Sequence, residues 1–215
     1  MKTLKQDWMI WLMLLIPFVF VAFVWNRLPD QIPTHFGLDG KPDDYSGRAV
    51  GALVMPLMNV GIYFLFIVLP KIDPRKKSYE MFEDKYRIIR IILHAFFTFA
   101  FFVTIFYALG YHFNLSMLIM YGVLCLFLIL GNYMGNIRPN FFIGIRTPWT
   151  LSSEKVWMKT HRLTAKIWVS STLIMMVVMP FVPFFDVFFG VYIAVIVIVP
   201  YGYSYIEYKK EQKNG

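Results

Sequence analysis

Residues 131–168 read GNYMGNIRPNFFIGIRTPWTLSSEKVWMKTHRLTAKIW, and this stretch decides how the rest of the chain is interpreted. It lies between two long apolar runs, yet it collects Arg, Thr, Trp, His, Asn and Pro in a short polar segment. Most of the remaining chain consists of runs typical of lipid-embedded helices, in which polar side chains are costly and usually functional. We therefore expect a functional site, if the chain has one, to lie in this segment.

The composition indicates that the chain is embedded in a lipid bilayer. Of its 215 residues, 58% are hydrophobic and only 16% are charged, which leaves too little polar surface to cover a soluble domain of this size. A run of about 20 apolar residues crosses a hydrocarbon core of about 30 Å. We expect such spans at about 8–25, 50–69, 88–110, 115–134, 167–184 and 187–206. The predicted fold is all-α, a polytopic membrane protein with six transmembrane helices.

The distribution of charge predicts the orientation of these spans. In the six-span arrangement, 18 of the 21 Lys and Arg lie on the side of the two termini, and the other three lie in the first loop. The acids are divided more evenly: eight of the 13 lie on the side of the termini and five on the opposite side. Positive charge collects on the cytoplasmic side of membrane proteins, so we expect both termini to be cytoplasmic and the loop 26–49 to be extracellular. The net charge of +8 is thus explained by the orientation of the spans. We therefore predict no direct binding of nucleic acid.

Within the central segment, the pattern predicts a loop followed by a helix. Pro139 keeps the fourth span from continuing, and Gly144 and Pro148 set the path of an irregular loop over 140–149. Thr150 is the expected N-cap of a helix that runs into the fifth span. One face of this helix carries Trp157, His161, Thr164 and Trp168, and the opposite face carries Lys155, Lys159, Arg162 and Lys166. The part before the fifth span is therefore expected to be an interfacial amphipathic helix.

Two interpretations of this helix remain open. Its indoles can lie at the headgroup level with the cations toward anionic lipid, or its aromatic face, with Arg146 and His161, can form a docking surface for a partner. For Arg146, a loop staple through backbone carbonyls and a direct binding role are both open; for the lone His161, a packed side chain is favoured. The candidate binding residues are Asn140, Gly144, Arg146, Thr147, Pro148, Trp149, Thr150, Trp157, His161 and Arg162, with Lys155, Lys159 and Lys166 as a cytoplasmic basic face.

The first loop, 26–49, is rich in Pro, Gly and Asp, which indicates turns rather than regular structure. We expect a compact extracellular cap packed by Phe36 and Tyr45. The loop residues that are candidates for contact with an outside partner are Pro33, His35, Phe36, Asp39 and Gly40. A metal site would need more ligands at fixed spacing, commonly a second His or a Cys. We therefore predict no metal site here.

Signatures of catalysis are missing from the sequence. It contains no Walker loop, no His-Glu-x-x-His and no Gly-x-Ser-x-Gly. The spans show no charge pair suited to a proton relay, and His94 is close enough to the interface to be solvated. We predict a protein without catalytic residues and without a cofactor.

The central segment resembles the SdpI family of bacterial membrane proteins. The residues that carry the resemblance are Gly131-Asn132, Asn136, Pro139-Asn140, Gly144-Ile-Arg-Thr-Pro-Trp-Thr150, Trp157 and Thr160-His-Arg162. The first loop, with Leu28-Pro-x-x-Ile-Pro33, His35-Phe36 and Asp39-Gly40-x-Pro-Asp43, and the connector Asp73-Pro-Arg-Lys76 resemble an uncharacterised domain that often precedes the SdpI segment. Together these stretches cover most of the chain.

This resemblance implies a function as well as a domain organisation. It implies an N-terminal membrane domain, 1–110, with a basic cytoplasmic connector at 70–87, and an SdpI-like domain, 111–215, with its motif segment at 135–166. Proteins of this kind are expected to protect the cell from a secreted, membrane-active peptide toxin. A second implied role is signal transduction, in which an autorepressor is held at the membrane. The outer loop would then meet the toxin, and the basic inner face, with Arg146, Trp149, Lys155, Lys159 and Arg162, would meet the repressor.

Two other classes of function stay open from the sequence alone. A small-molecule or ion transporter or channel would require polar residues from several spans to converge on one cavity. A membrane-embedded enzyme using His161, Arg146 and Asn140 would require a second acid or base, and Glu154 is the only one nearby in the sequence.

Overall fold

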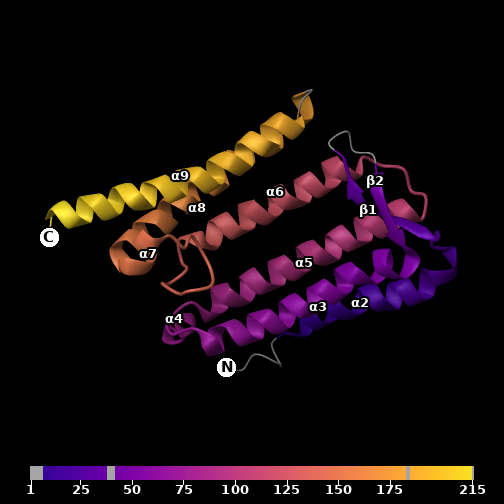
Figure 1. Ribbon diagram of the computed structural model, residues 1–215, viewed down its shortest axis with the longest axis horizontal. Helices are drawn as coiled ribbons and strands as arrows, with labels where there is room; N and C mark the ends of the chain where they lie inside the picture. The colour runs from indigo at the N-terminus through magenta and orange to yellow at the C-terminus, as the bar shows by residue number, and fades with distance from the viewer. Residues whose placement is uncertain (1–6, 38–41, 183–184, 215) are drawn as a thin grey trace. The chain divides into compact units, whose positions relative to one another are not determined.

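The computed structural model describes residues 7–37, 42–182 and 185–214, and within them six helices are long and apolar enough to cross a membrane. They are α2 (Trp8–Val24), α3 (Arg48–Ile72), α5 (Glu83–Ala108), α6 (Leu115–Met134), α8 (Glu154–Val178) and α9 (Phe185–Asn214) (Figure 1). Short helices extend or join them: η1 (Trp25–Arg27), α4 (Lys77–Glu80), α7 (Pro148–Ser152) and η2 (Met179–Phe181). The prediction of an all-α membrane protein with six spans is confirmed, and its orientation stays a prediction.

The region around Thr150 differs from the expected single helix. Thr147, not Thr150, caps α7, and its hydroxyl accepts a hydrogen bond from the backbone N–H of Thr150. Ser153 has an extended backbone and caps α8 by accepting from the N–H of Val156. Because Ser153 separates the two helices, α8 begins at Glu154 and continues through the membrane as one element. The prediction of Thr150 as the N-cap is therefore wrong, whereas the expected continuation of the amphipathic helix into the fifth span agrees with α8; its interfacial position stays a prediction.

The first loop contains regular structure, contrary to the prediction of turns alone. Strands β1 (Gln31–Phe36) and β2 (Pro42–Gly47) pair antiparallel, with Ile32 opposite Ser46 and Pro33 opposite Tyr45. A two-stranded ribbon consists of two edge strands, and edge strands tolerate proline. Ile32 is fully buried in a core cluster with Val21, Val24, Leu28, Ala52, Phe101 and Ile105, and this anchor holds the hairpin in place. Phe36 packs edge-on against Tyr107, but Tyr45 is 49% exposed and does not pack the cap.

The chain folds as two units that each draw on separate stretches of sequence. Unit 1 comprises residues 1–66 and 90–123, and unit 2 comprises residues 67–89 and 124–215. These limits do not coincide with the expected domains 1–110 and 111–215, because the connector after α3 and the start of α5 belong with the C-terminal half. The domain assignment by sequence remains a prediction.

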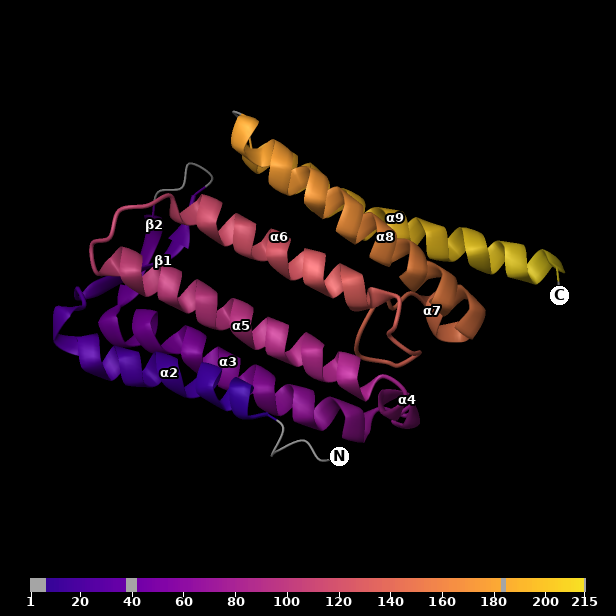
Figure 2. The same ribbon diagram turned by 180° about the vertical axis from the view of Figure 1, so that it is seen from behind.

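Unit 2 is organised around the packing of α8 on α9, which lie side by side in both views (Figures 1 and 2). The indole N–H of Trp168 donates to the carbonyl of Ile196 at 3.0 Å, and the hydroxyls of Thr172 and Tyr192 are 2.5 Å apart. At the same residue of α8, Gly131 of α6 approaches so closely that a Cβ there would lie 2.8 Å from the Cβ of Trp168. The glycine therefore permits the close contact between α6 and α8.

Candidate functional site

Asn140 organises the loop between α6 and α7. Its side-chain oxygen accepts from the backbone N–H groups of Phe142, at 2.9 Å, and Ile143, at 2.7 Å. Its amide nitrogen donates to the carbonyls of Arg138, at 2.9 Å, and Ile143, at 3.0 Å. Asn140 is fully buried, and its hydrogen bonds go to the loop itself and to the hydroxyl of Tyr79, which donates to its side-chain oxygen at 3.4 Å. It shapes the site and does not present a polar group to a ligand.

The connector after α3 docks onto this loop through Asp73, which the sequence analysis did not select. The carboxylate of Asp73 accepts from the N–H of Phe141 at 2.9 Å, from the hydroxyl of Tyr79 at 3.0 Å and from the N–H of Arg75 at 2.7 Å. Burial and the hydrogen bond to Asp73 raise the pKa of Tyr79, so this phenol stays protonated as a donor. The sequence feature that indicates a turn in this connector is the Asp-Pro pair at positions 73 and 74.

Two arginines complete the loop. The guanidinium of Arg146 donates to the carbonyl of Phe141 at 2.9 Å, which is the loop staple, and its side chain remains exposed. Arg75 donates to the carbonyl of Leu151 at 3.0 Å and lies over the ring of Phe141 at 5.2 Å. Arg146 therefore closes the loop while it presents charge on the surface, so a binding role for it stays a proposal.

His161 is a packed residue and not part of a docking surface. Its Nδ1–H donates to the carbonyl of Trp157 at 2.8 Å, because a carbonyl only accepts. Its Nε2 then accepts from the N–H of Ile145 at 3.0 Å, and its ring stacks on Trp157 at 4.1 Å. Both rings are fully buried, as is Thr164, while Trp168 is 9% exposed. The aromatic face of α8 is thus the interior of unit 2, and the prediction that it docks a partner or lies among lipid headgroups is wrong.

The Thr147-Pro148-Trp149-Thr150 turn joins α7 to α9. The hydroxyl of Thr147 lies 3.0 Å from that of Ser204, and the hydroxyl of Thr150 donates to the carbonyl of Ile145 at 2.8 Å. The ring of Trp149 packs against those of Tyr201 and Tyr205 at 5.3 and 5.0 Å. Most of this turn is consequently used to position helices.

The basic face of α8, which the sequence predicts to be cytoplasmic, is partly neutralised. Lys159 and Lys210 both pair with Glu207, at 2.5 and 3.0 Å. Lys155, Arg162 and Lys166 are exposed, and none of the three has a carboxylate within 4.0 Å among the residues that the structure describes. The exposed cations of this helix without a carboxylate partner, among the described residues, are therefore Lys155, Arg162 and Lys166.

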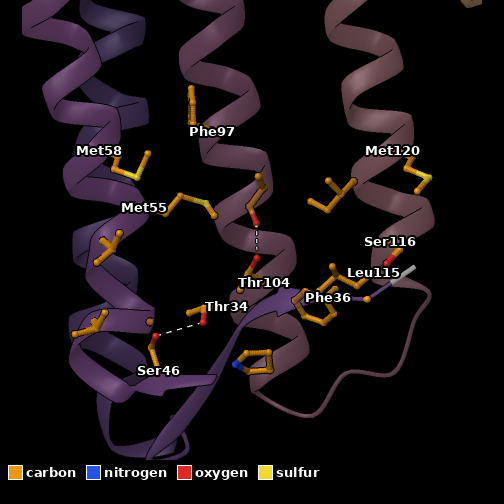
Figure 3. A pocket seen from close by; sticks show the side chains of 17 residues that line it. Thr34, Phe36, Ser46, Met55, Met58, Phe97, Thr104, Leu115, Ser116 and Met120 are labelled. Carbon is orange, nitrogen blue, oxygen red and sulfur yellow. Dashed lines mark hydrogen bonds between the residues drawn. The ribbon is translucent and has the colours of Figure 1, made fainter. Parts of the chain in front are cut away.

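The hairpin covers one side of an apolar cavity of about 580 Å³ in unit 1. The 17 lining residues come from β1, the residue after it, β2, α3, α5 and α6. Figure 3 labels Met55, Met58, Phe97 and Met120 among the apolar ones. Four hydroxyl side chains also line it: Thr34, Ser46, Thr104 and Ser116. Methionine side chains adapt to ligands of irregular shape. This cavity can therefore take apolar groups and offers a few hydroxyls to orient them.

Only some of the candidate binding residues of the first loop line this cavity. Pro33 and Phe36 line it. His35 does not line it, and its exposed ring lies 2.6 Å from the carboxylate of Asp43. Asp39 and Gly40 lie outside the described residues. Among the residues described here, no group of three His, Cys, Asp or Glu side chains is placed to hold a metal ion.

A buried polar cluster in unit 1 was also missed by the sequence analysis. Arg90 of α5 pairs with Asp7 at 2.6 Å, and their side chains are 1% and 0% exposed. One turn further along α5, His94 lies 2.7 Å from the side-chain oxygen of Asn59 and is fully buried. The interpretation of His94 as solvated is wrong, and Arg90, inside the third span, pairs with an acid that lies directly before the first span. The sequence features that indicate this cluster are an acid, Asp7, directly before the first span and an arginine, Arg90, inside the third.

Two segments of the chain match known families. Residues 136–204 match the SdpI/YfhL protein family, and residues 12–60 match a domain of unknown function, DUF1648. The first match lies in unit 2 and the second in unit 1. The chain is thus a multi-pass α-helical membrane protein that carries an SdpI/YfhL-family segment, as its central motif indicated.

A relative with an assigned role is Immunity protein SdpI of Bacillus subtilis (strain 168). It is 28% identical to this chain over 186 residues, which are 86% of this chain and 83% of the relative. No solved structure matches the chain. The similarity therefore extends over both units and is not confined to the motif segment.

Proposed function

We propose that this protein is a membrane immunity protein, which gives resistance to a secreted, membrane-active peptide toxin by binding it, without catalysis. The observation that carries the proposal is the similarity to Immunity protein SdpI along 86% of the chain. The structure is consistent with a binding protein, because the motif residues Asn140, Trp157 and His161 are buried and hydrogen-bonded to the fold. None of these three presents a free acid or base to a substrate.

The cavity under the hairpin is the toxin contact in this proposal. A membrane-active peptide must bury apolar side chains, and the cavity offers an adaptable apolar lining of about 580 Å³. The excess of Lys and Arg on the side of the two termini supports an extracellular position for the hairpin, where a secreted peptide would arrive. The hydroxyls of Thr34 and Ser46, 3.3 Å apart, provide donors for a peptide backbone.

Filling the cavity is expected to abolish protection. Val54 lines the cavity and its side chain is 44% exposed, so Val54→Trp adds volume there without entering the core. In a toxin-sensitive Gram-positive host, we expect the tolerated dose of a membrane-active toxin to fall by about tenfold or more, because such losses are typical for a contact at the centre of an interface. Survival and membrane potential are the readouts.

The matched control is Leu57→Trp on the same helix. Leu57 is 57% exposed and does not line the cavity, so this variant should protect like the wild type at equal membrane levels. Equal protection by both variants would exclude the cavity as the toxin contact. A wild type that gives no protection would reject immunity against the toxin used.

We further propose that the cytoplasmic face binds a transcriptional repressor of the protein's own operon. Exposed Arg146 and Lys155 supply the free charge for this contact. A fluorescent fusion of that repressor should collect at the membrane when toxin is added. The double variant Arg146→Gln/Lys155→Gln should leave the fusion in the cytosol, whereas Lys166→Gln should not. Membrane capture that is insensitive to the double variant would reject this contact.

The buried polar cluster of unit 1 is the structural feature that favours transport as an alternative function. The polar cluster of unit 1 joins side chains from α3 and α5 to Asp7, the residue before α2, as a transport site would require. However, Asp7, Arg90 and His94 are each no more than 1% exposed. Since they are buried against one another, the cluster is better explained as a fixed link between helices.

A further inference from the structure

A second cavity, of about 470 Å³, lies in unit 2 and is unlike the one under the hairpin. Three cations line it from three separate segments: Lys85 from the start of α5, Arg138 from the loop after α6 and Arg162 from α8. The amide of Asn136 also lines it, and none of the lining residues is an acid. The cavity therefore combines a charge of three cations with further hydrogen-bond donors.

The three cations lack strong acceptors among the described residues. No carboxylate lies within 4.0 Å of any of them, in contrast to Lys159 and Lys210, which share Glu207. Arg138 is half-buried and donates only to the thioether sulfur of Met158, at 3.9 Å. A thioether is a weak acceptor, and a guanidinium has five N–H donors. Lys85 is half-buried as well and lies over the ring of Tyr133 at 5.8 Å.

The cavity matches the chemistry of a phosphate group. Phosphate provides several oxygens that accept from arginine in a bidentate manner and from lysine as a point charge. Neutralising three converging cations requires an anion, and a phosphate diester or monoester carries enough acceptors for all three. Phe82 and Met158, which line the same cavity, supply apolar surface beside the charges.

We propose that this cavity binds the phosphate of an anionic phospholipid headgroup. The site lies where spans α5, α6 and α8 begin or end, on the side that the charge distribution assigns to the cytoplasm. Basic pockets between transmembrane helices on that side are suited to anionic headgroups. The headgroup phosphate accepts from Arg138, Arg162 and Lys85, and the glycerol region contacts Phe82 and Met158. This site is separate from the proposed toxin cavity, which lies in unit 1.

The test measures lipid binding by the full-length protein. Protein purified in a neutral detergent is titrated with phosphatidylglycerol, with phosphatidylcholine or with inorganic phosphate at constant ionic strength, and retained lipid is counted by native mass spectrometry alongside the melting temperature. We expect phosphatidylglycerol to bind and to raise the melting temperature more than the other two. Arg162→Gln and Arg138→Gln should each weaken its affinity about tenfold, since each removes charge-assisted hydrogen bonds.

Lys166→Gln is the matched control, because Lys166 is an exposed cation one turn beyond Arg162 on α8 and does not line the cavity. Its affinity for phosphatidylglycerol should stay within twofold of the wild type. Arg162 is exposed, so Arg162→Gln tests the site even if Arg138→Gln does not fold. The site would be overturned if Lys166→Gln and Arg162→Gln lost the same affinity for phosphatidylglycerol. It would also be overturned if Arg162→Gln lost none. If inorganic phosphate bound as tightly as the lipid and lost the same affinity in Arg162→Gln, the ligand would be free phosphate and not a lipid headgroup.

Discussion

Arg90→Met is expected to lower the free energy of unfolding by about 3–5 kcal/mol, the typical cost of removing one partner from a buried ion pair. Among the side chains that the structure describes, Asp7 would keep only the hydroxyl of Tyr63, at 3.4 Å, in a site where its side chain is 0% exposed. A carboxylate buried without its partner loses hydration that nothing else replaces. The measurement is unfolding in mixed micelles by titration with a denaturing detergent.

Two further variants separate this cost from a general loss of salt bridges. Asp30→Asn breaks an Arg–Asp pair of the same length, 2.6 Å, whose carboxylate is 95% exposed, so its cost should be below about 1 kcal/mol. The double variant Asp7→Leu/Arg90→Met replaces the pair by apolar side chains and should recover most of the loss. A double variant as unstable as Arg90→Met alone would show that burial of an unpaired charge is not the cause.

The six spans were predictable because the hydropathy of a span is a local property. A run of apolar residues reports its own burial in lipid, and α6 begins and ends at the predicted residues 115 and 134. The path of the motif loop was predictable for a similar reason, since Gly144 and Pro148 constrain their own backbone. The family resemblance, too, rested on contiguous residues.

The contacts that give the site its shape were not predictable, because they join residues far apart in the sequence. Asp73 binds the N–H of Phe141 across 68 residues, and Asp7 pairs with Arg90 across 83. The hairpin was missed because Pro and Asp are typical of turns, whereas the burial of Ile32 that anchors it depends on α2, α3 and α5. The burial of the face of α8 with Trp157 was not predictable either, because the periodicity of a helix does not tell whether protein or lipid covers its apolar side.

Gly144→Ala is expected to cost about 3 kcal/mol of unfolding free energy, from backbone strain together with overpacking. The φ of Gly144 is 109°, a conformation that residues with a Cβ rarely adopt. An added Cβ would also lie 2.3 Å from Nε2 of His161. The ring cannot move aside cheaply, because its Nδ1–H is bonded to Trp157 and it stacks on that indole. Gly202→Ala in α9 is the control, since no atom lies within 4 Å of its added Cβ, and it should be neutral or stabilising by up to about 1 kcal/mol.

The clash and the backbone strain can be separated with His161→Ala. Removing the imidazole relieves the overlap with the added methyl group but leaves the unfavourable φ in place. The double variant Gly144→Ala/His161→Ala should therefore be more stable than the sum of the two single losses, with a coupling of about 1–2 kcal/mol, as is typical of residues in direct contact. Additive losses would place the whole cost of Gly144→Ala in the backbone. A Gly144→Ala variant as stable as the wild type would contradict the close approach of this loop to His161, and with it the burial of His161 as the link between the loop and α8.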